Sequence, residues 1–347
     1  MVPSIDNPDS WLEYAEPDAE LQRMLDDGVQ PRFSGSDGIA GIPKHREKFD
    51  SIFLQDAAAA RETAGDSIKE EEIFIPTRDG SRIRALLYHP SQEHHGSGRP
   101  LVIMIHGGGF IVGTAEMETP PCIAVAKSYD CICVSLEYRL SPEVKFPVAY
   151  EDCWDAIVWL SSNAPSRWGA NLDKGFILGG LSAGGHISIP LSHKARDEAL
   201  NPPLTGLYLG VTPSLMPQAL TEEYKPFYKS RQQLANGMTL TAESTKLYDE
   251  AVEPDMDSPY WNPLLWPTGH ANLPPTFFQI CGADLLRDEA LIYERTLRVD
   301  HRVKTKAIVY PGLPHVFWYN FPGHSASSRY IDDTRRGYGW LLGREEL

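Results

Sequence analysis

Runs of apolar residues of strand length alternate with helix-length segments from residue 71 onwards. Strands covered on both faces read as near-continuous apolar runs, so this alternation predicts an α/β protein with a mostly parallel sheet covered by helices. The two runs that flank the turn TRDGS are expected to form an antiparallel hairpin, because Asp-Gly stands at its centre. The other six strands are expected to be parallel. The eight predicted strands are 71–76, 82–90, 100–106, 131–138, 175–180, 204–211, 275–282 and 305–312.

Helical periodicity is clearest in FPVAYEDCWDAIVWLSSNA, residues 146–164, where apolar side chains recur at helical spacing. Further helices are expected after Ser182, after Asp288 and at the end of the chain. Their positions between predicted strands fit the alternation of an α/β sheet.

Two segments, residues 1–65 and 213–270, lie outside this alternation. The first contains the helical candidates WLEYAEPDAELQRMLDD and REKFDSIFLQDAAAARETA, and the second contains KSRQQLAN and TAESTKLYDEAV. An insertion of this size between strands is usually functional, which favours a lid. We therefore predict a catalytic domain, residues 66–212 and 271–347, beneath a two-part lid. The lid aromatics Tyr224, Phe227 and Tyr248 either line a pocket or only pack the lid onto the sheet.

The composition of the chain argues against several classes of function. The chain has 47 acidic and 32 basic residues and a net charge of -15, which argues against a nucleic-acid partner. The start MVPSIDNPDSWLEY lacks the features of a secretory signal, and no segment is long enough to span a membrane. Five cysteines lie mostly within apolar runs, where reduced cysteine packs as a small hydrophobe, so a cytoplasmic location is expected. Cys131 and Cys133 lack the CxxC spacing of a redox or zinc motif.

The segment GGLSAGGH, residues 179–186, follows a predicted buried strand and precedes a predicted helix. It contains G-x-S-x-G from Gly180 to Gly184, which in this context predicts a nucleophile on a sharp strand-to-helix turn. The glycines allow neighbouring backbone to pass close, and the helix N-terminus favours negative charge near Ser182.

A second glycine-rich stretch, HGGGF, begins at His106 at the carboxyl end of a predicted strand. Consecutive glycines leave backbone N–H groups able to approach a ligand, as stabilisation of a tetrahedral oxyanion requires. The expected oxyanion-hole donors are Gly108, Gly109 and Ala183. A flexible turn is the simpler alternative for the glycines, and His106 is expected to shape the loop rather than act as a base.

A serine nucleophile requires a base, and the loops after the last two predicted strands supply one. Asp284 follows FFQIC and His315 follows AIVYPG, each at the carboxyl end of its strand. Active sites of open parallel sheets lie beyond these ends, and the order serine, acid, histidine is the one found with a strand–turn–helix nucleophile. We therefore predict Ser182, Asp284 and His315 as a catalytic triad.

Alternatives exist for the acid and for the base. Asp288 and Glu289 could replace Asp284, but DEALIYERTL reads as the start of the following helix, where carboxylates favour the dipole. His301 and His324 are expected at the surface. His186 is expected to be a helix or pocket-wall residue.

These blocks, together with EYRLSPEVKFPVAYEDC, NLPPTFFQICGADLLRDE and PGLPHVFW, resemble the hormone-sensitive-lipase family of α/β hydrolases from about residue 70 to 342. The resemblance implies an eight-stranded α/β-hydrolase fold and a lidded carboxylesterase that needs neither metal nor cofactor. It also implies Ser182, Asp284 and His315 as the triad, and a buried polar network of Glu137, Arg139 and Glu143.

Two positions depart from the family pattern: Leu181 replaces a commonly polar residue, and Val316 stands where glycine is frequent. Acyl and alcohol preferences therefore do not transfer. The leading hypothesis is hydrolysis of a small or medium-sized carboxylic ester through an acyl-enzyme on Ser182. A lactone, thioester or amide substrate, or transfer to an alcohol, stays open, as does the oligomeric state, a homodimer included. A ligand receptor resembling the gibberellin receptors is disfavoured, because those have lost the histidine that is present here as His315.

Overall fold

The computed structural model describes residues 3–33, 38–92, 96–215 and 217–345. Its centre is one eight-stranded sheet in the order β1-β2-β4-β3-β5-β6-β7-β8. The hairpin β1–β2 is antiparallel, β2 also pairs antiparallel with β4, and all pairs from β4 to β8 are parallel, as predicted. The strands are β1 Ile68–Pro76, β2 Arg82–Pro90, β3 Leu101–Ile105, β4 Ile132–Glu137, β5 Phe176–Leu181, β6 Gly206–Gly210, β7 Thr276–Cys281 and β8 Thr305–Tyr310.

The first strand begins three residues earlier than its apolar run. Residues 69–72 are charged and exposed because β1 is an edge strand with solvent on one side. Hydrophobicity alone therefore marks only its second half. The central strands β3 and β5 are buried at every position, as their uninterrupted apolar runs predicted.

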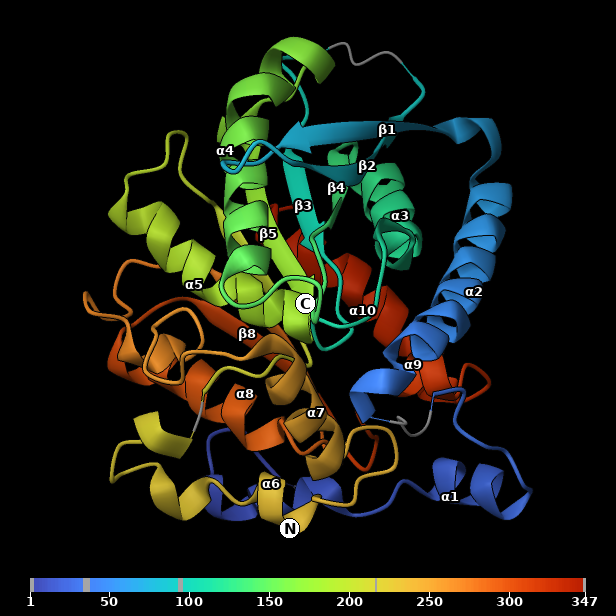
Figure 1. Cartoon of the computed structure of the whole chain (residues 1–347), viewed down its shortest axis with the longest axis vertical. Coiled ribbons are helices and arrows are strands. Elements are labelled where there is room, and N and C mark those ends of the chain that lie inside the picture. Colours follow the sequence, from blue (N-terminus) through green and yellow to red (C-terminus); the bar gives the residue numbers. More distant parts are fainter. Residues whose placement is uncertain (1–2, 34–37, 93–95, 216, 346–347) are drawn as a thin grey trace.

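Helices cover both faces of the sheet (Figure 1). Helices α4, α5 and α8 contribute to one apolar core with Ile103 and Ile105, whereas α3 and α10 contribute to the opposite core with Val102 and Met104. Alternate residues of β3 thus serve different faces. The helices of the sheet domain are α3 Thr119–Tyr129, α4 Val148–Trp168, α5 Ala183–Asp197, α8 Arg287–Arg295, α9 Phe317–Asn320 and α10 Ser325–Leu341, with a π-helical turn Thr296–Asp300 and 3₁₀ turns Gly65–Ser67, Ala115–Glu118 and Leu172–Lys174.

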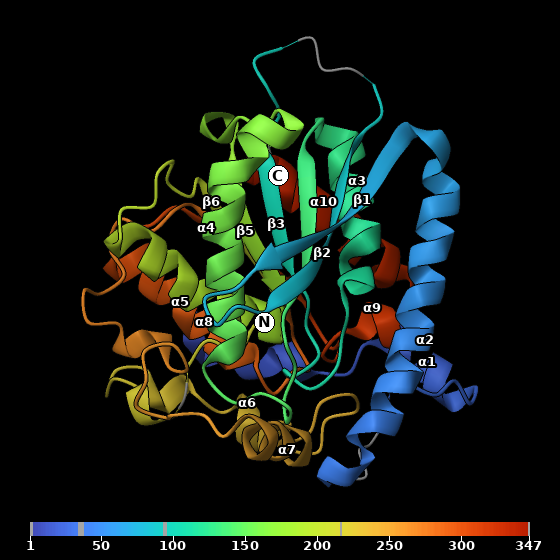
Figure 2. The same ribbon diagram turned by 45° about the horizontal axis from the view of Figure 1, so that its top comes forward.

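The N-terminal segment, residues 3–65, forms a 3₁₀ helix Pro8–Ala15, α1 Ala19–Asp26 and the long α2 Gly38–Ala64. WLEYAEPDAELQRMLDD is therefore two helices rather than one. The break falls at Pro17, and Asp18 caps α1 by accepting the N–H groups of Glu20 and Leu21. Helix α2 packs against α3 and also contacts α7 (Figures 1 and 2).

The inserted segment, residues 213–270, is mostly irregular. It contains α6 Ser230–Gln233, α7 Ala242–Val252 and 3₁₀ turns Pro217–Ala219, Lys225–Phe227 and Pro263–Leu265. KSRQQLAN forms only one helical turn, whereas TAESTKLYDEAV is helical, with Thr241 as its N-cap. Figure 2 shows α6 and α7 together at one end of the molecule.

The prediction that Glu137, Arg139 and Glu143 form one buried polar network is wrong. Glu137 ends β4, whereas the other two lie on the loop towards α4, so their side chains reach different neighbours. Glu143 is 62% exposed. The partners are Arg84 for Glu137, Asp152 and Asp79 for Arg139, and Arg46 of α2 for Glu143.

All five cysteines are buried free thiols, and the Cys131 and Cys133 sulfurs lie 3.7 Å apart within the core. Among the residues that the structure describes, no helix combines the length and apolarity that a bilayer crossing demands. Within the same residues, no cluster of histidine, cysteine and carboxylate side chains is suited to hold a metal.

Candidate active site

Ser182 occupies a strained turn between β5 and α5, with φ 50° and ψ −115°. Such a conformation costs a non-glycine residue about 1–3 kcal/mol and is maintained by its surroundings. A Cβ on Gly180 would lie 2.1 Å from the carbonyl carbon of Gly184, and a Cβ on Gly184 would lie 2.0 Å from the carbonyl oxygen of Ile105. Only glycine fits at these two positions, which is the physical basis of the G-x-S-x-G pattern here.

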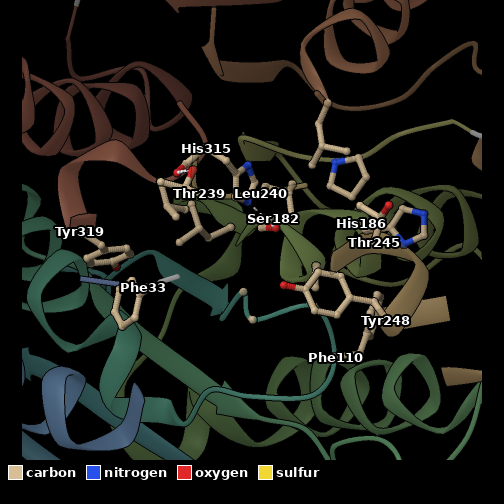
Figure 3. A pocket seen from close by; sticks show the side chains of 18 of the residues that line it. Phe33, Phe110, Ser182, His186, Thr239, Leu240, Thr245, Tyr248, His315 and Tyr319 are labelled. Atoms are coloured by element: carbon tan, nitrogen blue, oxygen red, sulfur yellow. Dashed lines mark hydrogen bonds between the residues drawn. The ribbon is translucent and has the colours of Figure 1, made fainter. Parts of the chain in front are cut away.

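The structure brings Ser182, His315 and Asp284 into one hydrogen-bonded chain, although they follow three different strands. Ser182 Oγ lies 3.1 Å from His315 Nε2, and His315 Nδ1 lies 2.6 Å from Asp284 Oδ2. Asp284 Oδ1 also accepts the N–H of Leu286 at 2.9 Å, which orients the carboxylate. Asp284 and His315 are both buried. Figure 3 shows His315 beside Ser182 among the residues that line the cavity.

The competing acids Asp288 and Glu289 belong to the first turn of α8, as predicted, and make other contacts. Asp288 Oδ2 accepts the N–H groups of Lys229 and Ser230 at 2.7 and 2.6 Å. Glu289 Oε1 accepts from Arg231 Nε at 2.6 Å. Both carboxylates are fully buried and attach the inserted segment to α8.

Two further histidines lie near the site without touching Ser182. His186 forms part of the cavity wall, as predicted, with its ring nitrogens 2.9 Å from the Tyr150 hydroxyl and 2.8 Å from the Trp261 carbonyl. Burial lowers the pKa of His186 to about 4, so it is neutral at physiological pH. His106 Nδ1 contacts the Gly107 carbonyl at 2.7 Å and its ring stacks on Tyr138, consistent with a loop-shaping role.

His324 is not a surface residue, contrary to expectation. It is only 4% exposed, caps α10 by accepting the N–H of Ala326, and contacts Asp18 at 2.9 Å. The contact with Asp18, the N-cap of α1, covers the histidine. Because Asp18 lies 306 residues away in the chain, the local sequence around His324 gives no sign of this contact. His301 is partly exposed.

The glycine loop after β3 lies against Ser182, and a Cβ on Gly107 would be 3.3 Å from the Ser182 Cβ. Gly108 and Gly109 have φ of 104° and 60°, in the left-handed region that favours glycine. A Cβ on Gly108 would lie 2.1 Å from the Val112 carbonyl oxygen, and one on Gly109 would lie 2.7 Å from the ring of Tyr248. Gly108, Gly109 and Ala183 all border the same cavity as Ser182.

This cavity has an empty volume of about 1010 Å³, including its open mouth. Its wall is assembled from the N-terminal segment, the inserted segment and the sheet domain. Of the three aromatics proposed from the sequence, Tyr248 lines it, whereas Tyr224 bonds Asp300 and Phe227 packs against Trp11. Sequence reasoning missed the other wall residues of the two segments, namely Phe33, Phe49, Phe53, Pro213, Arg231, Thr239, Leu240, Thr245, Asp249 and Trp261.

The two departures from the family pattern both border the cavity. Leu181 immediately precedes Ser182 and adds an apolar side chain to the wall. Val316 has φ 48° and ψ 40°, the left-handed conformation that explains why glycine is frequent there. Thr239 of the inserted segment donates to the His315 carbonyl at 2.7 Å and supports this strained loop.

An eight-stranded sheet with a strand–turn–helix serine, and with a histidine and a carboxylate on loops after later strands, defines the α/β-hydrolase class. A family model described as the alpha/beta hydrolase fold matches residues 102–319. The chain belongs to the hormone-sensitive-lipase family of α/β hydrolases.

The chain is similar to proteins named as hydrolases or esterases and to one named as a cyclase. AB hydrolase superfamily protein B1A11.02 of Schizosaccharomyces pombe is 36% identical over 330 residues, 95% of both chains. Versiconal hemiacetal acetate esterase of Dothistroma septosporum is 33% identical over 245 residues, 70% of this chain and 74% of that protein. The crystal structure of vibralactone cyclase superposes with a TM-score of 0.87 at 30% identity, covering 96% of each chain. These similarities support the assignment of the protein as a hydrolase.

Proposed function

We propose that the protein is a serine carboxylesterase that hydrolyses small or medium-sized esters through an acyl-enzyme intermediate. The observation that carries the proposal is the continuous hydrogen-bonded chain from Ser182 through His315 to Asp284. A hydroxyl is a weak nucleophile at neutral pH, and this arrangement provides a base and an orienting acid within hydrogen-bond distance.

In the proposed reaction, Ser182 Oγ attacks the ester carbonyl carbon while His315 Nε2 takes its proton. Asp284 holds the imidazole in the productive orientation and stabilises the imidazolium. The N–H groups of Gly108, Gly109 and Ala183 stabilise the oxyanion. His315 then protonates the departing alcohol. Finally, water gives a proton to His315 Nε2 and attacks the acyl carbon. The bond to Ser182 Oγ then breaks, His315 returns the proton to Oγ, and the acid leaves.

We also propose that residues 1–65 and 213–270 form a two-part lid over a catalytic domain of residues 66–212 and 271–347. The mixed lining of the cavity supports this division, because both segments contribute wall residues. The five buried free thiols support a reducing, cytoplasmic compartment.

A second candidate keeps the same acyl-enzyme but replaces water by a hydroxyl group, giving transfer or ring closure. The similarity to vibralactone cyclase supports this second candidate, because a cyclase is named for ring closure. Mass spectrometry of the products from a panel of esters and lactones separates the two: free acid indicates hydrolysis, whereas a new ester or lactone indicates transfer.

The experiment that tests the proposed function is steady-state hydrolysis of p-nitrophenyl acetate by the wild type and by Ser182→Ala. Turnover is expected to fall on the order of 10⁶-fold, towards background. Ser192→Ala is the matched control, because Ser192 lies on α5 and its hydroxyl donates a hydrogen bond to the Ile189 carbonyl of the same helix. Equal activity of wild type and Ser182→Ala would refute the proposal.

A further inference from the structure

A second cavity, also with an empty volume of about 1010 Å³ including its mouth, adjoins the first. The two cavities share Leu181 and Tyr319 as lining residues. Figure 3 shows Tyr319 at the edge of the first cavity, beside Phe33. The second cavity lies between α2, the start of α3, α9 and α10. Its main lining side chains are Glu118, Pro120, Pro121, Trp318, Tyr330 and Tyr338.

The order of residues along α2 shows that the cavities follow one another. Phe53 lines the first cavity, whereas Asp56 and Ala59, about one and two helical turns later, line the second. Likewise Met117 borders the first cavity and the next residue, Glu118, borders the second. The two cavities are therefore consecutive along α2, and Leu181 and Tyr319 line both of them.

Glu118 is an unusual residue to find in the wall of the second cavity. It is 7% exposed, and its Oε1 has no hydrogen-bond partner among the described residues. Burial raises the pKa of Glu118 to about 8, so the carboxyl is mostly neutral at physiological pH. Unpaired buried polar groups are costly, and a ligand that supplies the missing hydrogen bonds relieves the cost.

We propose that the second cavity binds the far end of a substrate chain that extends from Ser182 past Leu181 and Tyr319, and that Glu118 hydrogen-bonds a hydroxyl group at that end. The inference rests on the proposed esterase function and specifies its substrate class: a long, mainly apolar ester with a distal hydroxyl. A neutral carboxyl both donates and accepts, which matches a hydroxyl. The proline and tryptophan side chains match the apolar chain.

The test compares esters that range from acetate to palmitate with their terminally hydroxylated counterparts, in one series on the acyl side and in another on the alcohol side. The measured quantity is kcat/KM relative to p-nitrophenyl acetate. In one of the two series, the hydroxylated long chain is expected to exceed the plain one about tenfold, the usual effect of a buried hydrogen bond.

Glu118→Leu is expected to remove this preference, whereas Glu118→Gln, which keeps a neutral donor and acceptor, is expected to retain it. Ala59→Trp should obstruct the second cavity and lower activity on long chains relative to acetate. Ala58→Trp is its matched control, because Ala58 is an exposed neighbour on α2 outside the lining. Both alanines are exposed, so these variants test the cavity even if Glu118→Leu fails to fold.

Absence of a hydroxyl preference in both series would overturn the proposal. A preference for a terminal amine that Glu118→Gln abolishes would also overturn it, because Glu118 would then act as a carboxylate towards a cation. A wild type that does not hydrolyse acetate would instead refute the proposed esterase function. An acetate-active enzyme without the hydroxyl preference contradicts only the inference about the second cavity.

Discussion

The turn that holds Ser182 and the inserted segment border the same cavity, but they are fixed in different ways. The turn is determined by backbone sterics, because a Cβ at Gly180 would collide with the backbone of Gly184, and a Cβ at Gly184 would collide with the backbone of Ile105 at the end of β3. The inserted segment has little regular structure and is attached through side-chain contacts, among them those of the buried Asp288 and Glu289 of α8. The conformation at Ser182 is therefore fixed by close backbone packing, whereas the cavity wall depends on side-chain contacts between distant segments.

The largest expected difference between the site around Ser182 and the attachment of the inserted segment is seen by comparing Asp284→Asn with Asp288→Asn. Loss of the Asp284 carboxylate disfavours the productive tautomer of His315, so kcat is expected to fall on the order of 10⁴-fold. Asp288→Asn weakens the contacts to Lys229 and Ser230 and is expected to lower the free energy of unfolding by about 1–3 kcal/mol, with a far smaller loss of kcat. Ester kinetics and urea unfolding of both variants provide the check, and a reversed pattern would make Asp288 the acid.

Gly184→Ala tests the steric claim about the turn. The new Cβ would meet the carbonyl oxygens of Ile105 and His106 at 2.0 and 2.6 Å. We therefore expect the free energy of unfolding to fall by about 3 kcal/mol and ester hydrolysis to be lost as well. Gly323→Ala is the control, because only the end of Met24 lies near its Cβ, at 3.8 Å. Equal stability of the two variants, measured by thermal unfolding, would show that the turn tolerates a side chain.

Glu118 lies where α3 begins, between the sheet domain and α2, and it predicts a pH dependence of stability. Its folded-state pKa, about 8, exceeds the ordinary value of 4.5. The stability it contributes is therefore full below about pH 4.5 and is lost as pH rises through about 8. Relative to Glu118→Gln, the wild type is expected to lose on the order of 2 kcal/mol across this range, because local rearrangement relieves part of the burial penalty. Urea unfolding of both proteins at several pH values checks this, and parallel pH profiles would contradict it.

The smallest expected effect comes from Thr239→Val, which removes one hydrogen bond between the inserted segment and the His315 loop. We expect a loss of about 1 kcal/mol, seen as a roughly fivefold decrease in kcat/KM. Thr245→Val is the control, because Thr245 also borders the cavity but bonds the Ala242 carbonyl of its own helix. If both substitutions have the same effect, the inserted segment does not support the histidine loop.

Much of the fold, and the turn that holds Ser182, could be predicted from local sequence. Apolar runs located the strands, and the spacing of Gly180 and Gly184 located the turn at Ser182, because a side chain fits at neither position. Asp284 and His315 followed from their positions after parallel strands. Their catalytic roles stay predictions.

The features that could not be predicted depend on partners far away in the chain. His324 is buried by Asp18, and Phe33 and Thr239 reach the cavity from irregular segments with no periodic signal. The expected network around Glu137 failed for the same reason, since Glu143 pairs with Arg46 of α2. Such contacts become visible only when the segments are folded together.

Labelling with a fluorophosphonate probe, followed by mass-spectrometric mapping of the modified peptide, tests the proposed nucleophile most directly. The probe reacts with an activated serine hydroxyl, so a single adduct on Ser182 is expected, with loss of ester hydrolysis in proportion to labelling. Continued hydrolysis by protein in which Ser182 is fully modified, or inactivation by an adduct elsewhere while Ser182 stays free, would contradict the proposed mechanism.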